Sequence, residues 1–220
     1  MTQATIDELT LSDDPERWES LGFTVTGDVC QIGTVSVRLK GAREGGGILG
    51  WSLRDIASTD LDGLPTTRSH APAPEAADTH PNGTVAIDHV VAMSPCFQRS
   101  VDALLAAGLE LRRVREEPTP AGAPRQAFFR LGPEILELVQ EPEEVVERAG
   151  GPDRPARLWG LALRVRDLGT SAELMGEHLG TVRPAVQPGR LIATVRRSAG
   201  LHVPLALMSE TMGLVAEQAR

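Results

Sequence analysis

The chain repeats one order of predicted elements, and this internal repeat limits its folds more than any single motif does. The segment AIDHVVA (86–92) is strand-like and leads through a proline-containing turn into a helix-like segment that ends at Gly108. LWGLALRV (158–165) leads into a second helix-like segment, which ends at Gly180. The spacing from strand to glycine is the same in both copies. Equal spacing of this kind indicates repeated structural units.

An abbreviated copy precedes these two. TIDELTL (5–11) shares Ile-Asp with AIDHVVA, and DDPERWESLG (13–22) begins with helix-opening residues and ends with glycine. After each helix, short apolar runs separated by turn residues predict further strands. These strands are 23–26, 29–32 and 34–39 in the first copy, 110–116, 125–131 and 134–140 in the second, and 181–186, 190–197 and 202–208 in the third. The repeated unit is therefore strand, helix and three strands (βαβββ), and the fold class is α+β with three such modules, the first of them abbreviated.

Two linkers divide the modules. Residues 56–84 are rich in proline and almost without apolar periodicity, which predicts an extended or mobile connector. The predicted organisation is an abbreviated N-terminal module with an added strand (1–55), a linker (56–84), a βαβββ module (85–140), a linker (141–157) and a βαβββ module (158–220).

The added strand ILGWSLR (48–54) echoes 158–164 at Gly, Leu and Arg. Two interpretations stay open for it: an extra edge strand, or the opening strand of a module whose remainder was lost. The first module would otherwise keep an unpaired sheet edge, which invites pairing with the same edge of a second chain or with 48–54. On that ground we expect a homodimer.

Composition excludes several classes of partner. The formal net charge of −8 argues against binding to nucleic acid or to an anionic membrane, and the arginines form no basic block. No apolar run approaches the roughly 18 residues that span a bilayer, and the N-terminus lacks a signal-peptide pattern, so we expect a cytoplasmic protein. Cys30 and Cys96 lie far apart and in no CxxC spacing, which makes a disulfide or a zinc-thiolate site improbable.

One histidine and one glutamate interrupt apolar strands. His89 lies between Ile87 and Val91, and Glu137 lies in EILELV. Strand alternation places Glu137 on the face of its apolar neighbours two residues away, and Glu134 on the opposite face. An ionised carboxylate in such surroundings is costly unless it is paired or binds a metal. The two side chains could ligate one divalent cation or hydrogen-bond to each other.

The βαβββ repeat, together with HPNGTVAIDHVV, RQAFFRLG, ILELVQ, LWGLAL and QPGRLIATVRR, resembles the vicinal oxygen chelate superfamily. This superfamily includes glyoxalase-like proteins, extradiol dioxygenases, antibiotic-resistance proteins and some epimerases. The resemblance implies that two modules pair into a half-open barrel, or cup. It also implies that each module can lend a metal ligand from its first strand and a carboxylate from its last, with the remaining coordination positions open to vicinal oxygens of a substrate.

The residues at these positions differ between the modules. His89 and Glu137 match the ligand positions of the second module, whereas Leu161 and Leu205 occupy them in the third, with Ala206 beside Leu205. In the first module the same counts give Glu8 and Arg38. Modules two and three therefore carry half of a metal site.

Three interpretations of His89 and Glu137 follow: a structural pair, a polar patch in a cup without a tightly bound metal, or a metal site completed by Glu8, His202, a substrate or a second subunit. The cofactor is accordingly unknown: one divalent metal ion is the candidate, but we expect none to be tightly bound. His70 and His80, in the connector, are expected to be solvated.

Other side chains are candidates for binding a ligand. Arg125 and Gln126 could point into the cup from the third strand of their module, and Gln187 and Arg190 flank the QPGR turn. An arginine in the cup would favour a carboxylate or phosphate ligand. The leading hypothesis is a glyoxalase-like enzyme that converts a small oxygenated molecule by lyase-, isomerase- or dioxygenase-type chemistry, with Glu137 as general base. The alternative is a non-catalytic, antibiotic-like binding protein with a degenerate metal site. A third possibility is a purely structural or partner-binding module, with the connector 56–84 as a docking segment.

Overall fold

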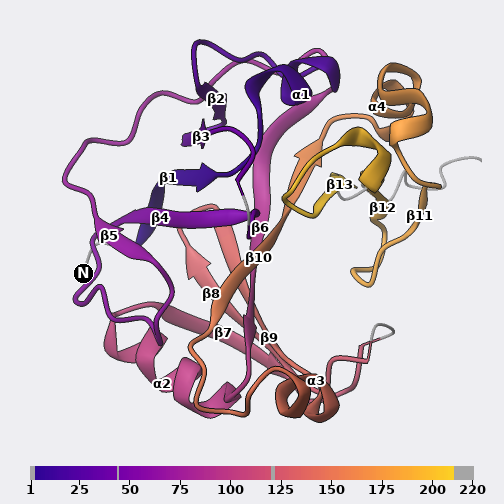
Figure 1. Cartoon of the computed structure of the whole chain (residues 1–220). Helices are drawn as coiled ribbons and strands as arrows, with labels where there is room; N and C mark the ends of the chain where they lie inside the picture. The colour runs from indigo at the N-terminus through magenta and orange to yellow at the C-terminus, as the bar shows by residue number, and fades with distance from the viewer. Residues whose placement is uncertain (1–2, 44, 120–121, 211–220) are drawn as a thin grey trace, which may run out of the picture.

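The computed structural model describes residues 3–43, 45–119 and 122–210 (Figure 1). Its strands form two sheets. One has five strands, in the order β2-β3-β1-β4-β5, and the other has eight, in the order β11-β12-β13-β10-β6-β9-β8-β7. The strands of the first are β1 (Thr5–Leu11), β2 (Val29–Ile32), β3 (Val35–Leu39), β4 (Ile48–Arg54) and β5 (Thr66–Arg68). Those of the second are β6 (Thr84–Ser94), β7 (Glu110–Arg115), β8 (Gln126–Leu131), β9 (Glu134–Gln140), β10 (Arg157–Val165), β11 (Arg183–Pro184), β12 (Leu191–Thr194) and β13 (Leu205–Ser209).

The helices are short. They are α1 (Pro15–Ser20), α2 (Phe97–Ala106), α3 (Glu143–Arg148) and α4 (Leu168–Met175), with one-turn helices η1 (Gly176–His178) and η2 (Arg197–Ala199). Asp167 caps α4 by accepting a hydrogen bond from the Gly169 amide at 2.8 Å. No helix of the described residues is both long and apolar enough to cross a membrane.

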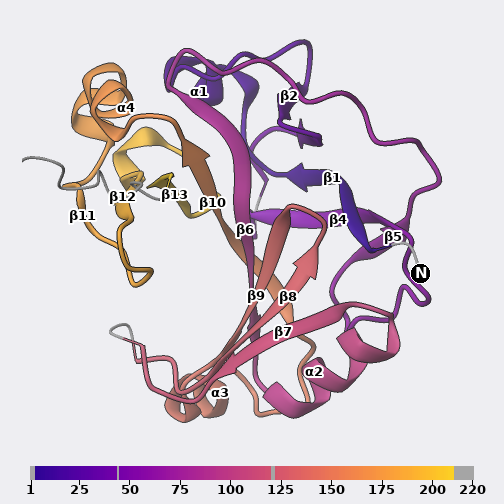
Figure 2. The ribbon, with the colours of Figure 1, turned by 180° about the vertical axis from the view of Figure 1, so that it is seen from behind.

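The eight-stranded sheet contains two complete βαβββ modules. One consists of β6, α2 and β7–β9, and the other of β10, α4 and β11–β13. In each module the first strand runs parallel to the last, and β6 pairs antiparallel with β10 to join the modules. The joined sheet curves and does not close, and its concave face is turned away from the five-stranded sheet (Figures 1 and 2). The predicted α+β class and half-open cup are confirmed.

The N-terminal sheet departs from the expected pattern at 23–26. These residues form no strand, and only Thr26 makes an isolated bridge, to Val29, in a tight turn. The first module therefore has two strands after its helix. Its opening strand β1 pairs parallel with β3, as β6 does with β9.

The segment 48–54 is the opening strand of a reduced fourth module. β4 pairs antiparallel with β1 as β10 does with β6, and parallel with β5 as β10 does with β13. A Cβ added at Gly50 would lie 2.9 Å from the Pro65 carbonyl oxygen, and one at Gly160 would lie 2.8 Å from that of Pro204. The free edge of β1, on which the homodimer prediction rested, is thus occupied within the chain, and that argument for a dimer is lost.

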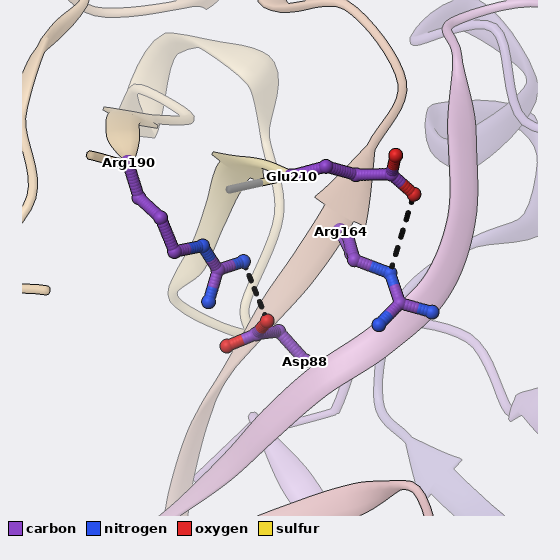
Figure 3. Close-up of a pocket in the computed structure, with 4 residues that line it drawn as sticks. All are labelled: Asp88, Arg164, Arg190 and Glu210. Atoms are coloured by element: carbon purple, nitrogen blue, oxygen red, sulfur yellow. Dashed lines mark hydrogen bonds and ion pairs between the residues drawn. The ribbon is translucent and has the colours of Figure 1, made fainter. Parts of the chain in front are cut away.

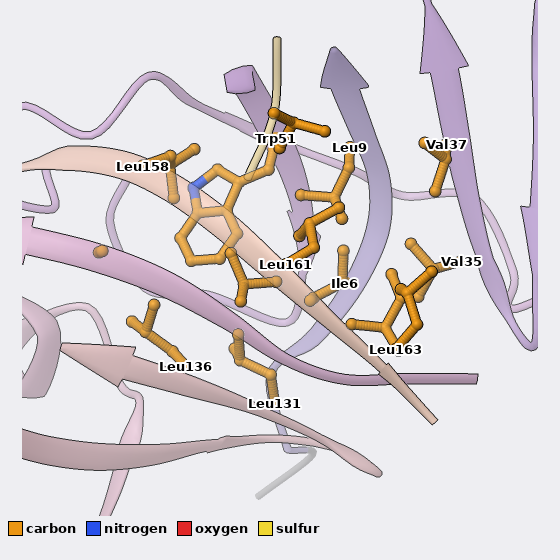
Figure 4. Packing of buried hydrophobic residues seen from close by; sticks show 14 of the residues in the cluster. Ile6, Leu9, Val35, Val37, Trp51, Leu131, Leu136, Leu158, Leu161 and Leu163 are labelled. Atoms are coloured by element: carbon orange, nitrogen blue, oxygen red, sulfur yellow. The ribbon is translucent and has the colours of Figure 1, made fainter. Parts of the chain in front are cut away.

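The two sheets bury a common core between them. Ile6, Leu9 and Trp51 from the N-terminal sheet meet Leu136 and Leu161 from the C-terminal sheet (Figure 4). These side chains alternate along their strands with side chains on the opposite face. The face of the eight-stranded sheet that points away from this core is therefore free to build a site.

The proline-rich segment 56–84 is not the loose connector that its composition predicts. It contains β5, buries Leu61 and Leu64, and places His80 at only 5% exposure. The Nδ1 atom of His80 accepts a hydrogen bond from the Thr24 amide at 3.0 Å, and Nε2 lies 3.0 Å from the Gln31 carbonyl oxygen. The expectation of a solvated His80 was wrong because these backbone partners satisfy the ring inside the fold.

Candidate active site

A β-bulge in β6 creates the candidate site. The pairing of β6 with β10 shifts between Ile87 and His89, so that Asp88 is the extra residue. A bulge interrupts the strict alternation of side chains between the two faces. Asp88 and His89 therefore line the same cavity although they are neighbours in the sequence.

Asp88 holds two basic groups. Its Oδ2 atom lies 2.9 Å from His89 Nδ1, and its Oδ1 accepts a hydrogen bond from Arg190 Nη2 at 2.6 Å (Figure 3). Arg190 also donates from Nε to the Ser209 carbonyl oxygen at 2.8 Å. Burial by itself would raise the pKa of Asp88, but the hydrogen bonds from His89 and Arg190 outweigh it and lower the pKa from 3.8 to about 2. Asp88 is thus a permanent anion that fixes the orientation of the imidazole.

His89 also contacts Glu137. The Nε2 atom of His89 lies 3.3 Å from Glu137 Oε2, and both side chains are about 15% exposed or less. The other oxygen of Glu137, Oε1, accepts a hydrogen bond from Gln126 Nε2. The side chains therefore form a continuous row, Arg190–Asp88–His89–Glu137–Gln126, along the concave face.

Arg125 does not join this row. Its Nε donates to Gln140 Oε1 at 2.8 Å, and its guanidinium lies 4.6 Å from the centre of the Phe97 ring. Since Arg125 and Gln126 are neighbours in an extended strand, they project to opposite sides. The expectation that both would point into the cup fails for Arg125.

The third module presents alanine to the site. Ala162 pairs directly with His89 across β6 and β10, and Ala206 pairs with Ala162. Leu161 and Leu205, which the residue counts placed at the ligand positions, are buried in the core between the sheets. The residue counts along β10 and β13 were therefore wrong by one, and a shift of one residue moves a side chain to the opposite face of a strand. The third module still supplies no ligand, because neither alanine nor leucine can bind a metal.

The first module shows the same geometry with different residues. Glu8 pairs with Ser52 as His89 pairs with Ala162, and Arg38 on β3 corresponds to Glu137 on β9. Arg38 and Glu8 form an ion pair, with Nη2 and Oε2 2.7 Å apart. Glu8 therefore belongs to a separate pair on the other sheet and does not complete the site at His89.

The site opens onto a cavity of about 610 Å³ between the two modules of the eight-stranded sheet. Besides Asp88 and His89, its wall includes Arg190 and Gln187 from module three, and arginines and apolar residues from module two. A smaller hollow of about 180 Å³ adjoins it at Asp88 and Arg190, with Arg164 and Glu210 on its far side (Figure 3). The volume of the larger cavity suits a small molecule.

The sequence reasoning missed Asp88. Its signal was the repeated Ile-Asp, because Asp7 in β1 is the corresponding extra residue of a second bulge, between Ile6 and Glu8. Asp7 forms an ion pair with Arg54, as Asp88 does with Arg190. The aspartate that follows isoleucine in both opening strands, Asp7 in β1 and Asp88 in β6, is thus the bulge residue of each strand.

Comparison with solved structures identifies this architecture. A mutant of 4-hydroxymandelate synthase from Streptomyces coelicolor matches over 94% of this chain and 93% of its own, with a TM-score of 0.64 and 14% identity. An extradiol ring-cleaving dioxygenase from B. fuscum matches over 96% of this chain and 72% of its own, with a TM-score of 0.58 and 12% identity. The protein has the vicinal oxygen chelate fold.

A third match, a fusion of a xylose isomerase-like TIM barrel with 4-hydroxyphenylpyruvate dioxygenase, has a TM-score of 0.60 at 12% identity. It covers 98% of this chain, which spans 50% of the length of the fusion protein. No family model matches the sequence, and no curated protein matches it. The vicinal oxygen chelate fold is thus identified by comparison of structures and not by comparison of sequences.

The residues present do not fit the metal that this fold can hold. His89 Nε2 and Glu137 Oε2 could both touch one cation, but Ala162 and Ala206 face them from the other module. Within residues 3–43, 45–119 and 122–210, no group of three or more His, Cys, Asp or Glu side chains could bind a metal ion. His202 lies elsewhere, beside Ser12 and a glycine turn. Two ligands hold a cation weakly, since catalytic zinc usually has three protein ligands.

Proposed function

We propose that the protein converts a small oxygenated molecule by proton transfer at His89, without a tightly bound metal ion. The observation that supports this proposal is the contact of His89 with Asp88 on one ring nitrogen and Glu137 on the other, in the wall of a cavity. A histidine oriented by a carboxylate is a common general acid or base. The fold of ring-cleaving and hydroxymandelate-forming enzymes is compatible with such a role.

The arrangement assigns a different task to each side chain. Asp88 is ionised at neutral pH and accepts a hydrogen bond from His89 Nδ1, so that Nδ1 carries the ring proton. Nε2 then faces both Glu137 and the cavity. When His89 takes a proton from a carbon next to a carbonyl, the C–H bond breaks, an N–H bond forms and the electron pair stays on the substrate as an enolate. Glu137 stabilises the imidazolium.

His89 replaces Glu137 as the proposed base. One oxygen of Glu137 accepts a hydrogen bond from Gln126, and the other lies 3.3 Å from His89 Nε2, where it can accept a hydrogen bond once Nε2 has taken up a proton. His89 lines the cavity, whereas Glu137, on the neighbouring strand β9, is not among its lining residues. A general base must lie within hydrogen-bond reach of the proton that it takes, so the residue that lines the cavity is the better candidate.

Solvent exchange tests this proposal without knowledge of the product. The protein is incubated in deuterium oxide with a panel of small 2-oxo and 2-hydroxy acids, and NMR follows deuterium incorporation next to the carbonyl or hydroxyl. We expect catalysed exchange with at least one compound, reduced by about 100-fold in His89→Gln. An unchanged rate in His89→Gln, or no exchange with any of the panel, would refute the proposal.

A non-catalytic binding protein is the second candidate. It is favoured by Ala162 and Ala206, because the third module supplies neither an acid nor a base opposite His89. A binding protein would take up a ligand saturably and leave all its hydrogens unexchanged. The same NMR samples, read for line broadening of the ligand, separate the two candidates.

A further inference from the structure

We infer that the cup recognises its ligand through an anionic group, a carboxylate or a phosphate, held by Arg112 and Arg113 on β7 with Arg130 on β8. This inference rests on the proposed function and names the class of ligand for the same cavity. The three arginines line the cavity of about 610 Å³ together with Arg190 and His89. Arg112 and Arg113 are adjacent in the sequence, and the fold brings Arg130 and Arg190 to the same cavity.

The charge of the cavity wall is opposite to that of the chain. The chain has a formal net charge of −8, yet among the described residues the wall contains four arginines and one carboxylate, that of Asp88. Arg190 is already neutralised by Asp88 at 2.6 Å. Positive charge concentrated in a concave site attracts and orients anions.

A bulge in β7 brings two of these arginines to the same side of the sheet. The pairing of β7 with β8 shifts between Leu111 and Arg113, so that Arg112 is the extra residue. In a regular strand Arg112 and Arg113 would project to opposite faces, but here both line the cavity. The bulge at Asp88 in β6 acts in the same way on the adjoining wall.

The two neighbouring arginines are available for an external anion. Within the described residues, Arg112 makes no ion pair and no side-chain hydrogen bond, and the guanidinium of Arg113 lies over the Phe128 ring, 4.9 Å from its centre. Arg130 Nε is 3.4 Å from Glu110 Oε1, in an exposed pair that a ligand can displace. Guanidinium groups bind carboxylate and phosphate oxygens in a bidentate manner.

The other residues of the cavity wall indicate the chemistry of the rest of the ligand. Phe128 and Ile135 supply an apolar surface on β8 and β9, between the arginines of β7 and His89 on β6. The ligand would therefore carry an anionic group at one end, a short apolar or planar segment in the middle, and the reacting group near His89.

Titration with two simple anions tests this inference. Protein labelled with ¹⁵N at arginine is titrated at constant ionic strength with inorganic phosphate and, separately, with benzoate, and the side-chain NεH signals are followed. Saturable shifts with either anion support the inference, and the tighter of the two identifies phosphate or carboxylate as the recognised group. If neither anion saturates the arginine signals of the cavity, the inference is refuted.

Matched variants separate a built site from general attraction. Arg112→Gln/Arg113→Gln should weaken binding by at least about tenfold, the loss expected for charged hydrogen bonds. Arg196→Gln/Arg197→Gln removes the same charge from two neighbouring arginines that are exposed and outside the cavity, and should change binding less than twofold. Equal weakening in both double variants would overturn the inference. His89→Gln should keep anion binding while losing proton exchange, so failure of the anion site and failure of the proposed chemistry give different results.

Discussion

Glu134 makes the stability of this protein depend on pH in a way that one substitution should remove. Glu134 lies on β9 with 3% exposure and faces the core between the two sheets. Burial raises its pKa from 4.5 to about 7, and the positive charges of Arg164 and Arg54 offset only part of this effect. The ionised form of Glu134 therefore costs the folded state about 3 kcal/mol relative to the neutral form.

The sign of the effect follows from the raised pKa. Below pH 4.5 Glu134 is neutral in both the folded and the unfolded chain, and it does not oppose folding. As pH rises toward 7, the unfolded chain releases the proton first, so the free energy of unfolding falls, and it levels off above about pH 7. Relative to Glu134→Gln, the wild-type protein should lose about 2–3 kcal/mol between pH 5 and pH 8.5.

Urea denaturation followed by tryptophan fluorescence measures this difference. Both proteins are unfolded at pH 5 and at pH 8.5, and the difference between their unfolding free energies is compared at the two values. Glu19→Gln, a change of the same type at an exposed residue of α1, is the control and should show no pH-dependent difference. A difference between wild type and Glu134→Gln that stays constant within about 0.5 kcal/mol would contradict the reasoning.

Three further predictions use other parts of the fold. Burial lowers the pKa of His80 from 6.5, so the stability that the neutral ring contributes is present above pH 6.5 and is lost as pH falls below it. In thermal melts, His80→Gln should therefore lose less melting temperature at acid pH than the wild-type protein does. Ala162→His places a third ligand opposite His89 and should raise zinc affinity at least tenfold in calorimetric titration, and an unchanged affinity would show that the two positions do not converge. Gly160→Ala should lower the free energy of unfolding by about 1–3 kcal/mol, because the added Cβ would lie 2.8 Å from the carbonyl oxygen of Pro204. If urea denaturation shows no change, the segment that contains Pro204 can move away from the new methyl group without cost.

Much of the fold could be predicted from the sequence because its signals are local. Alternation within AIDHVVA and EILELV, and the glycine stops after the helices, need only neighbouring residues to be read, and they predicted both complete modules. The expected strand at 23–26 was wrong, since Thr26 is drawn into a tight turn with Val29. The prolines of the connector predict a loose segment, but Leu61 and Leu64 are buried in the common core and His80 hydrogen-bonds to backbone atoms of Thr24 and Gln31.

The candidate site depended on tertiary structure for a specific physical reason. Residue counts along a strand assign faces correctly only while alternation is unbroken, and the bulges at Asp88 and Arg112 break it. A difference of one residue likewise placed Ala162, rather than Leu161, opposite His89.

From the sequence alone the repeated βαβββ units could be predicted, and the resemblance to the vicinal oxygen chelate superfamily implied the half-open cup and the proximity of His89 and Glu137. Only the tertiary structure decided which side chains meet there: Asp88 and Glu137 around His89, alanine across from it, and the arginines of β7 and β8 around the cavity. The reason is that alternation and helix signals act between neighbours in the chain. Bulges and the pairing of β6 with β10, in contrast, are settled by packing between segments that are far apart in sequence.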